Sequence, residues 1–116
     1  MASRTIPQAE WRAFFNGVAD ALVGKRAEVE VASLDLGDQI VAEWVPLLGI
    51  TYDAQDDLLD VALSGLSHLI RRPREIYVQE SPKGVEMVAV VSDDGLKQIL
   101  HLRDPLMLPA AERGGC

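Results

Sequence analysis

The chain has few of the residues on which many enzymes and secreted domains depend. Its 116 residues include one cysteine, Cys116, and two histidines, His68 and His101. A single cysteine excludes an intrachain disulfide and a cysteine-based metal cluster. Aromatic residues make up only 5% of the chain and are not interleaved with basic ones, which argues against stacking on single-stranded nucleic acid.

Long apolar runs are also absent. Apolar runs such as residues 45–48 and 88–91 are far shorter than the ~20 residues that a membrane helix needs, and the N-terminus lacks the apolar run of a signal peptide. We therefore expect a cytoplasmic protein without membrane contact. Lys and Arg number 11 against 18 Asp and Glu, so the net charge is −7, which disfavours binding to phosphate backbones of nucleic acid.

One segment has the period of an amphipathic helix. Its apolar residues recur at helical spacing and comprise Trp11, Phe14, Phe15, Val18, Ala19 and Leu22. Thr5 followed by Gln8 fits a capping box, and Gly24 is the expected stop. The spacing predicts a helix that ends before Gly24 and buries this stripe against a sheet.

After the helix, the chain reads as short strands separated by turn residues. Residues 85–91 and 97–102 flank Asp93-Asp94-Gly95, a strong hairpin signal. Pro46 marks a strand end or a bulge, so residues 48–52 form another strand or continue the same strand after a bend. We predict an α+β fold, with one N-terminal amphipathic helix packed on a bent antiparallel sheet or small barrel of about six to eight short strands.

The length fits one domain, because single domains cluster near ~100–150 residues. We place this domain at residues 1–102, followed by a C-terminal tail at residues 103–116 that we expect to be partly disordered. The tail ends in Gly114-Gly115-Cys116, similar to the end of a ubiquitin precursor. A modifier of that kind begins with a hairpin rather than a helix, so this ending indicates no role.

Three stretches carry a family resemblance. They are Ile-Pro-Gln-Ala-Glu-Trp from residue 6, Tyr-Asp-Ala-Gln-Asp-Asp-Leu-Leu from residue 52, and Arg-Pro-Arg-Glu-Ile from residue 72. Together they resemble a domain-of-unknown-function family of small bacterial proteins, over residues 6–102. The resemblance implies one bacterial domain and supplies no activity, ligand or catalytic residue.

Four carboxylates lie close together in the sequence: Asp53, Asp56, Asp57 and Asp60. Oxygen-rich clusters suit Mg²⁺ or Ca²⁺, but the spacing does not match an EF-hand, because Leu58 and Ser64 stand where Gly and Glu are needed. We favour a solvated turn in which aspartates accept backbone N–H groups. A metal site remains the alternative.

Three arginines surround Pro73: Arg71, Arg72 and Arg74. Guanidinium groups bind carboxylates and phosphates in a bidentate manner, so this cluster is a candidate anion or partner site. The competing interpretation is pairing with the chain's own carboxylates. Because Pro73 favours an extended Arg72, we expect Arg72 and Arg74 to share a face and Arg71 to depart from it.

No catalytic constellation can be assembled from the sequence. His68 and His101 lack a nucleophile partner, there is no Gly-x-Ser-x-Gly elbow, and no glycine-rich phosphate loop is present. We expect both histidines to be structural, and we assign no catalytic residue and no cofactor.

The favoured function is therefore a small soluble binding or accessory protein that acts through a surface on an unknown protein partner. The alternative is a metal-dependent hydrolase or nuclease that uses the carboxylates of residues 53–60. We also favour a homodimer over a monomer, because strand alternation places apolar residues on both faces of the sheet and one helix covers one face. The alternation sets Val41 and Val45 opposite to Ala42 and Trp44. Closure of the sheet into a barrel would hide both faces without a partner.

Overall fold

The computed structural model describes residues 2–33 and 37–104. Its elements are β1 (Ala2–Thr5), the 3-10 helix η1 (Gln8–Glu10), α1 (Trp11–Leu22), β2 (Arg26–Ser33), β3 (Gly37–Asp53), β4 (Leu58–Leu63), β5 (Leu66–Arg71), β6 (Pro73–Ser81), β7 (Gly84–Ser92) and β8 (Lys97–Arg103). The strands pair in the order β1-β6-β7-β8-β2-β3-β4-β5, and every neighbouring pair is antiparallel. The α+β prediction is confirmed at this level, and the sheet is open, with β1 and β5 at its edges.

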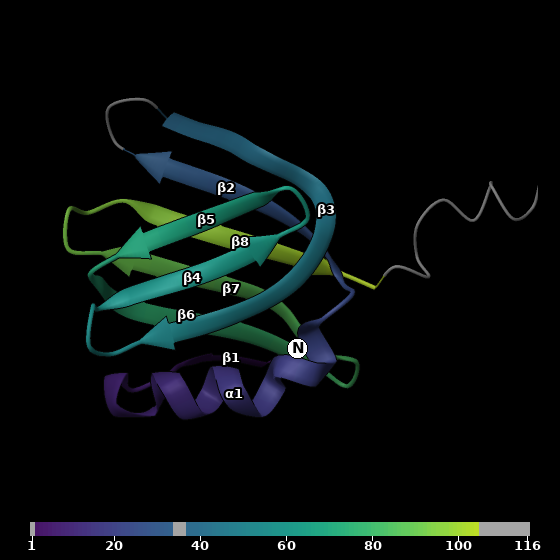
Figure 1. The fold of residues 1–116 in the computed structure, drawn as a ribbon, viewed down its shortest axis with the longest axis horizontal. Helices are drawn as coiled ribbons and strands as arrows, with labels where there is room; N and C mark the ends of the chain where they lie inside the picture. Colours follow the sequence, from purple (N-terminus) through teal and green to yellow (C-terminus); the bar gives the residue numbers. More distant parts are fainter. Residues whose placement is uncertain (1, 34–36, 105–116) are drawn as a thin grey trace, which may run out of the picture.

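The sheet folds back on itself into two layers (Figure 1). The long, curved β3 pairs with β2 in its first part and with β4 in its last part, so it carries β4 and β5 in front of β7 and β8. Leu59 and Ile70 of the front layer and Val88 and Leu100 of the back layer are fully buried in one core. The interpretation that residues 48–52 continue the same strand after a bend is confirmed.

Bulges in β3 produce the bend. The register between β2 and β3 shifts on both sides of Val29, and Trp44 has a φ of 52°. An extra residue in one strand kinks it and strengthens its twist. Ala42 and Val45 both pack toward the core, opposite buried residues of β2. The prediction that Ala42 and Val45 face opposite sides is therefore wrong, because alternation at period two fails across a bulge.

Helix α1 covers one end of the space between the two layers (Figure 1). Trp11, Phe15 and Leu22 are buried, and Phe14 packs against the core as a partly buried residue, as the stripe predicts. The helix ends before Gly24, whose φ of 92° only glycine adopts readily. None of the helices among the described residues is long and apolar enough to cross a bilayer.

The predicted capping box at Thr5 is wrong. Thr5 is the last residue of β1 and lies opposite Tyr77 of β6, and the N-cap residue of α1 makes no side-chain capping bond. The N-terminal residues thus add an edge strand that the sequence analysis did not anticipate. The strand is anchored by its ladder with β6 and by the bond from the Ile6 N–H to the Ile76 carbonyl, at 2.8 Å.

Other boundaries shift slightly. The predicted hairpin between β7 and β8 is confirmed, and β8 extends to Arg103, one residue past the expected domain end. Residues 34–36 and the predicted tail from residue 105 lie outside the described residues.

Candidate functional site

Two regions of the surface gather arginines, and the first is a set of side chains that we call the arginine corner. It consists of Asp57, Arg72, Arg74 and Asp93. Asp57 follows the end of β3, Arg72 lies between β5 and β6, and Asp93 lies in the turn after β7. Three connections that are distant in sequence therefore meet at one end of the two layers.

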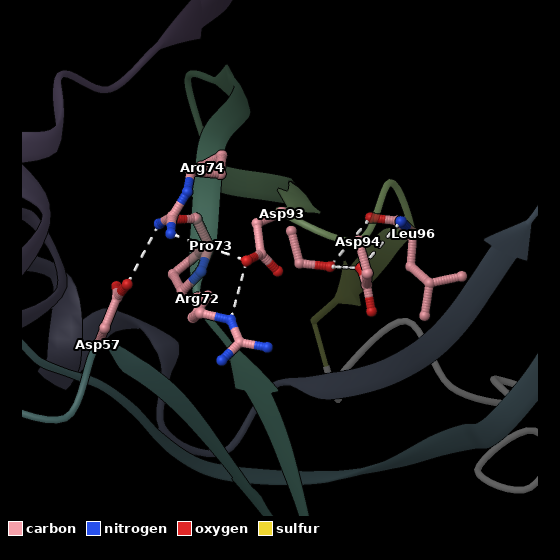
Figure 2. Close-up of polar contacts among 8 residues, drawn as sticks. Asp57, Arg72, Pro73, Arg74, Asp93, Asp94 and Leu96 are labelled. Carbon is pink, nitrogen blue, oxygen red and sulfur yellow. Dashed lines mark hydrogen bonds and ion pairs between the residues drawn. The ribbon is translucent and has the colours of Figure 1, made fainter.

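Each guanidinium of the arginine corner faces a carboxylate (Figure 2). Arg72 Nε lies 2.8 Å from Asp93 Oδ2, and Arg74 Nη1 lies 3.1 Å from Asp57 Oδ2. Arg74 Nη2 also approaches Asp93 Oδ2 at 3.9 Å, so Arg74 stands between the two carboxylates (Figure 2). The side chains of Arg72 and Arg74 are 63% and 46% exposed, so these pairs are screened by water.

The backbone at the arginine corner is in an unusual conformation. Asp57 and Arg72 have φ values of 51° and 50°. The Arg72 N–H donates to the Asp57 carbonyl at 2.8 Å, and the Asp93 N–H donates to the Arg72 carbonyl at 3.0 Å. The expected extended conformation of Arg72 is therefore wrong, because a left-handed residue makes the step from the front layer to the back layer. Arg72 and Arg74 nevertheless both reach the Asp93 carboxylate. Arg71 lies in β5, opposite Leu58 of β4.

A buried tyrosine supports the same corner. The Tyr52 hydroxyl donates to Asp57 Oδ1 at 2.8 Å. This hydrogen bond and the nearby Arg74 guanidinium hold the pKa of Asp57 below its usual value. Burial, followed by the bond to Asp57, raises the pKa of Tyr52 above its usual value. Both groups are thus held in the charge state that the contact requires at neutral pH.

The other predicted carboxylates do not converge with Asp57. Asp53 Oδ1 accepts the N–H groups of Gln55 and Asp56, at 2.9 and 3.2 Å, as expected for a solvated turn. Asp60 lies within β4, opposite Thr51, and its Oδ1 is buried without a hydrogen-bond partner. Within the described residues, no three side chains of His, Cys, Asp or Glu form a group that could hold a metal ion.

The second region is a cavity of about 410 Å³ that we call the Trp44 pocket. Its lining comes from β3, β6, β7, β8 and the adjoining turns, and comprises Lys25, Trp44, Gln79, Lys83, Glu86, Met87, His101, Leu102, Arg103 and Asp104. Gln79, Met87 and His101 are cross-strand neighbours in β6, β7 and β8, so their side chains share one face of the back layer.

Two arginine side chains contact Trp44. The Arg103 guanidinium carbon lies 3.7 Å from the centroid of the Trp44 ring, a close cation–π contact. Arg26 Nη1 donates to the Trp44 carbonyl at 3.4 Å. Arg26 and Arg103 are themselves direct register partners on β2 and β8. Among the described residues, the ion pairs involve Arg4, Arg72, Arg74 and His101, and none involves Arg26 or Arg103.

His101 connects the pocket to a group of acidic residues on the same face. Its Nε2 lies 3.2 Å from Glu30 Oε1. Bonds from Asp38 and His101 lower the pKa of Glu30, and the contact with Glu30 raises the pKa of Asp38. The other histidine, His68, is bonded to Gln98 across the two layers. Both histidines therefore contact polar side chains of neighbouring strands.

Sequence reasoning did not single out Trp44, Arg26 or Arg103. Arg26 opens the strand after the helix and Arg103 closes the last strand, and they meet because β2 pairs with β8. Lys25 and Arg26 follow the end of α1, where basic side chains complement the helix dipole. Only the strand order shows that Arg103 lies next to Arg26.

The comparisons with known proteins place the chain in a family without assigning a role. No solved structure matches this chain. The profile of a family of unknown function, DUF5335, matches residues 2–111, and the chain belongs to this family. It is also 34% identical over 110 residues to an uncharacterized protein from Aquifex aeolicus (strain VF5), covering 94% of this chain and 99% of that protein. The expected membership in an uncharacterised family of small bacterial proteins is confirmed.

Proposed function

We propose that this chain is a small non-enzymatic binding protein whose ligand site is the Trp44 pocket. The observation that best supports this is the cavity of about 410 Å³, which is within the range of ~300–1,000 Å³ common for ligand sites. Trp44 and Met87 supply apolar surface, while Gln79, His101 and Arg103 supply polar groups at the same place. Such a mixture suits binding of a small molecule with both an apolar and a polar part.

The described lining of the pocket lacks one common class of catalytic nucleophile. None of the described side chains that line it belongs to Ser, Thr, Cys or Tyr, so the lining offers no hydroxyl or thiol nucleophile. Its histidine, His101, is held by Glu30 at 3.2 Å. The groups that are present can orient and retain a ligand.

The two indole N–H signals of the chain provide a direct test by nuclear magnetic resonance. Trp44 lines the pocket, whereas the Trp11 indole is buried and donates to the Ile6 carbonyl at 2.8 Å. In a screen of small-molecule fragments, we expect ligands that shift the Trp44 indole and the Met87 amide while the Trp11 indole stays in place.

Two variants make this screen specific. Trp44→Leu should abolish the response of the Met87 amide to each hit, and Arg72→Gln, at the distant arginine corner, should leave it unchanged. A library that yields no ligand for Trp44, or hits that shift both indoles equally, would contradict the proposal.

The arginine cluster offers a competing binding surface. Arg71 is exposed, and no ion pair with a described residue holds it, but a ligand of Arg72 and Arg74 must displace Asp93 and Asp57. If this surface binds the protein's partner, the double variant Arg72→Gln/Arg74→Gln should lose a partner that co-purifies with the wild-type chain. Retention of that partner would assign the cluster a structural role.

The hydrolase alternative requires a divalent cation at Asp53, Asp56, Asp57 and Asp60. Their contacts give it little support, because Asp57 already binds Tyr52 and Arg74, and Asp53 accepts two backbone N–H groups. A titration with Mg²⁺ followed by amide chemical shifts decides the question. Specific shifts at residues 53–60 at sub-millimolar metal would support the alternative, and their absence would reject it.

Self-association is a separate proposal with a simple test. Val88 and Val90 of β7 are buried in the core between the two layers, so the folding of the sheet covers that face. Exposed apolar side chains remain at Leu48, Leu66 and Leu69 in the front layer. Light scattering at micromolar concentration that gives the mass of one chain would contradict a homodimer.

A further inference from the structure

The charges around Trp44 are unbalanced in a way that points to the ligand. Arg26 and Arg103 are direct partners on antiparallel strands, and such partners place their side chains next to each other on one face. Like charges in this position destabilise a sheet. The chain carries 18 carboxylates against 11 basic residues, yet no described carboxylate lies within ion-pair distance of either arginine.

The geometry of Arg103 leaves its hydrogen-bond donors available. Its guanidinium lies 3.7 Å from the centre of the Trp44 ring, and the described residues accept none of its N–H groups. A guanidinium that packs through its face still presents donors in its own plane, in the fork that matches a carboxylate or phosphate. The indole also fixes the side chain in place, which reduces the entropy lost on binding.

The rest of the lining adds to the positive charge. Lys25 and Lys83 line the same cavity, and neither is ion-paired with a described residue. Two carboxylates also line it, but Glu86 accepts a hydrogen bond from Ser81 at 2.5 Å, and Asp104 has a partner of its own. The three lining cations outnumber the two lining carboxylates by one, and Arg26 lies beside them. Glu28 and Glu30 lie further along the same face of β2, so the positive surplus is confined to the lining around Arg103.

We infer that the Trp44 pocket binds an organic anion, a small carboxylate or phosphate attached to an apolar or planar body. The charged group of the ligand meets Arg103 and Lys25, and its body packs against Trp44 and Met87. This inference rests on the proposed function and adds the chemical class of the ligand. An anion at this place also relieves the repulsion between Arg26 and Arg103, so binding and local stability are coupled.

Matched probes that differ only in charge test the inference. The probes are 3-phenylpropanoate, its neutral amide 3-phenylpropanamide, and inorganic phosphate alone, each titrated into the full chain while the Trp44 indole signal is followed. We expect the carboxylate to bind about tenfold more tightly than the amide, because charge-assisted hydrogen bonds exceed neutral ones by more than 1 kcal/mol. Phosphate alone should bind more weakly than phenylpropanoate, because it lacks the apolar body, and high salt should weaken both anions.

Variants assign the effect to Arg103. Arg103→Gln should reduce the affinity for 3-phenylpropanoate about tenfold, to the level of the amide, and leave the affinity for the amide within about twofold. Arg103→Lys should recover only part of the loss, because lysine keeps the charge and lacks the planar fork. The matched control, Arg72→Gln, removes an exposed arginine from the arginine corner and should change neither affinity.

The outcomes separate this inference from the proposed function. Equal affinity for the acid and the amide overturns the assignment of an anion and leaves a neutral ligand site in place. A preference for the acid that survives Arg103→Gln overturns the role of Arg103. If neither probe shifts Trp44 while the fragment screen yields neutral ligands, the anion class fails and the site stands, whereas failure of both experiments removes the site itself.

The chain's own C-terminal segment is the competing occupant, because residues 106–108 follow Asp104, which lines the pocket. The full-length variant Leu106→Ser/Met107→Ser/Leu108→Ser tests it. We expect unchanged affinity for 3-phenylpropanoate. An affinity about tenfold higher for the acid and the amide alike would show that the segment occupies the pocket, and would overturn the inference.

Discussion

In the arginine corner, Arg72 and Arg74 lie 2.8 and 3.1 Å from carboxylates, whereas in the Trp44 pocket Arg103 lies 3.7 Å from an indole ring and next to Arg26. Both regions gather arginines on a chain with a net charge of −7. In the arginine corner, the arginines join three connections of the fold. At the Trp44 pocket, Arg103 and the adjacent Arg26 have no described counter-ion.

This difference shows that local charge density in the sequence is a poor guide to a binding site. The three arginines around Pro73 are conspicuous because they are close in the sequence, and two of them are neutralised by the nearby turns. Arg26 and Arg103 are separated by most of the chain and meet only through the pairing of β2 with β8. A guanidinium that stacks on an aromatic ring has no opposite charge beside it, whereas one that pairs with a carboxylate has its charge offset.

The largest loss of stability is expected for a core residue of helix α1, and it gives a scale for the smaller effects at the two arginine regions. Phe15 is fully buried in the core, so Phe15→Ala should lower the free energy of unfolding by about 3–5 kcal/mol. Arg12→Ala, on the exposed side of the same helix, should cost less than about 0.5 kcal/mol. Urea denaturation measures both. Equal midpoints for the two variants would show that the helix packs differently.

The arginine corner should respond next. The double variant Arg72→Gln/Arg74→Gln removes both pairs with Asp57 and Asp93 and should cost about 1 kcal/mol, because exposed ion pairs contribute ~0.2–1 kcal/mol each. Arg12→Gln is the matched control for the loss of positive charge alone and should leave the midpoint in place. A loss above ~2 kcal/mol would mean that the corner is held by more than screened pairs.

Acid should remove the contribution of the Asp57 carboxylate to the stability of the arginine corner. The pKa of Asp57 is held below its usual value, so its contribution to stability is present above the unfolded-state pKa of ~3.9 and is lost as the pH falls through the lower folded-state pKa. Asp57→Asn should therefore be less stable than the wild type at neutral pH, and the gap should narrow below about pH 4. Asparagine tolerates the positive φ of 51°, so the substitution isolates the charge.

A control in the pocket sharpens this experiment. Arg103→Gln should show a stability difference from the wild type that is the same at neutral and acid pH, since no described carboxylate pairs with Arg103. Urea denaturation at both pH values provides the comparison. A gap for Asp57→Asn that stays constant as the pH falls would show that the bonds from Tyr52 and Arg74 do not depend on the charge of Asp57.

The features of the fold that depend on residues close in the sequence could be predicted, whereas those that depend on distant partners could not. The helix stripe and the hairpin between β7 and β8 depend on neighbours within about a dozen residues, and periodicity and turn chemistry predicted both. The edge strand β1 was missed because its partner, β6, lies far along the chain. Thr5, read as a helix cap, satisfies its backbone in that ladder instead.

The bend in β3 shows a second limit. Pro46 indicated a bulge or a strand end, but the count of alternating faces from Val41 to Val45 failed at the irregular residues around Trp44. The same bulge places Trp44 where Arg103 can stack on it, so the candidate site depends on the feature that period-two reasoning does not handle. Only the cross-strand register of β2, β3 and β8 contains that information.

The smallest expected effect concerns the sign of a salt dependence. Arg26→Gln removes one of two opposed like charges, so it should raise the free energy of unfolding by a few tenths of a kcal/mol at low ionic strength, and salt should reduce the gain. Arg4→Gln is the matched control, because Arg4 Nε lies 2.9 Å from Glu80 Oε1 and its removal should cost stability, again less in salt. The changes in the free energy of unfolding should therefore have opposite signs in the two variants, and both should shrink as salt is added.

The buffer must contain neither phosphate nor carboxylate, which would bind between the arginines and hide the repulsion. If Arg26→Gln destabilises the chain as much as Arg4→Gln does, the two arginines at Trp44 are already neutralised in the free protein, and the contrast with the arginine corner disappears.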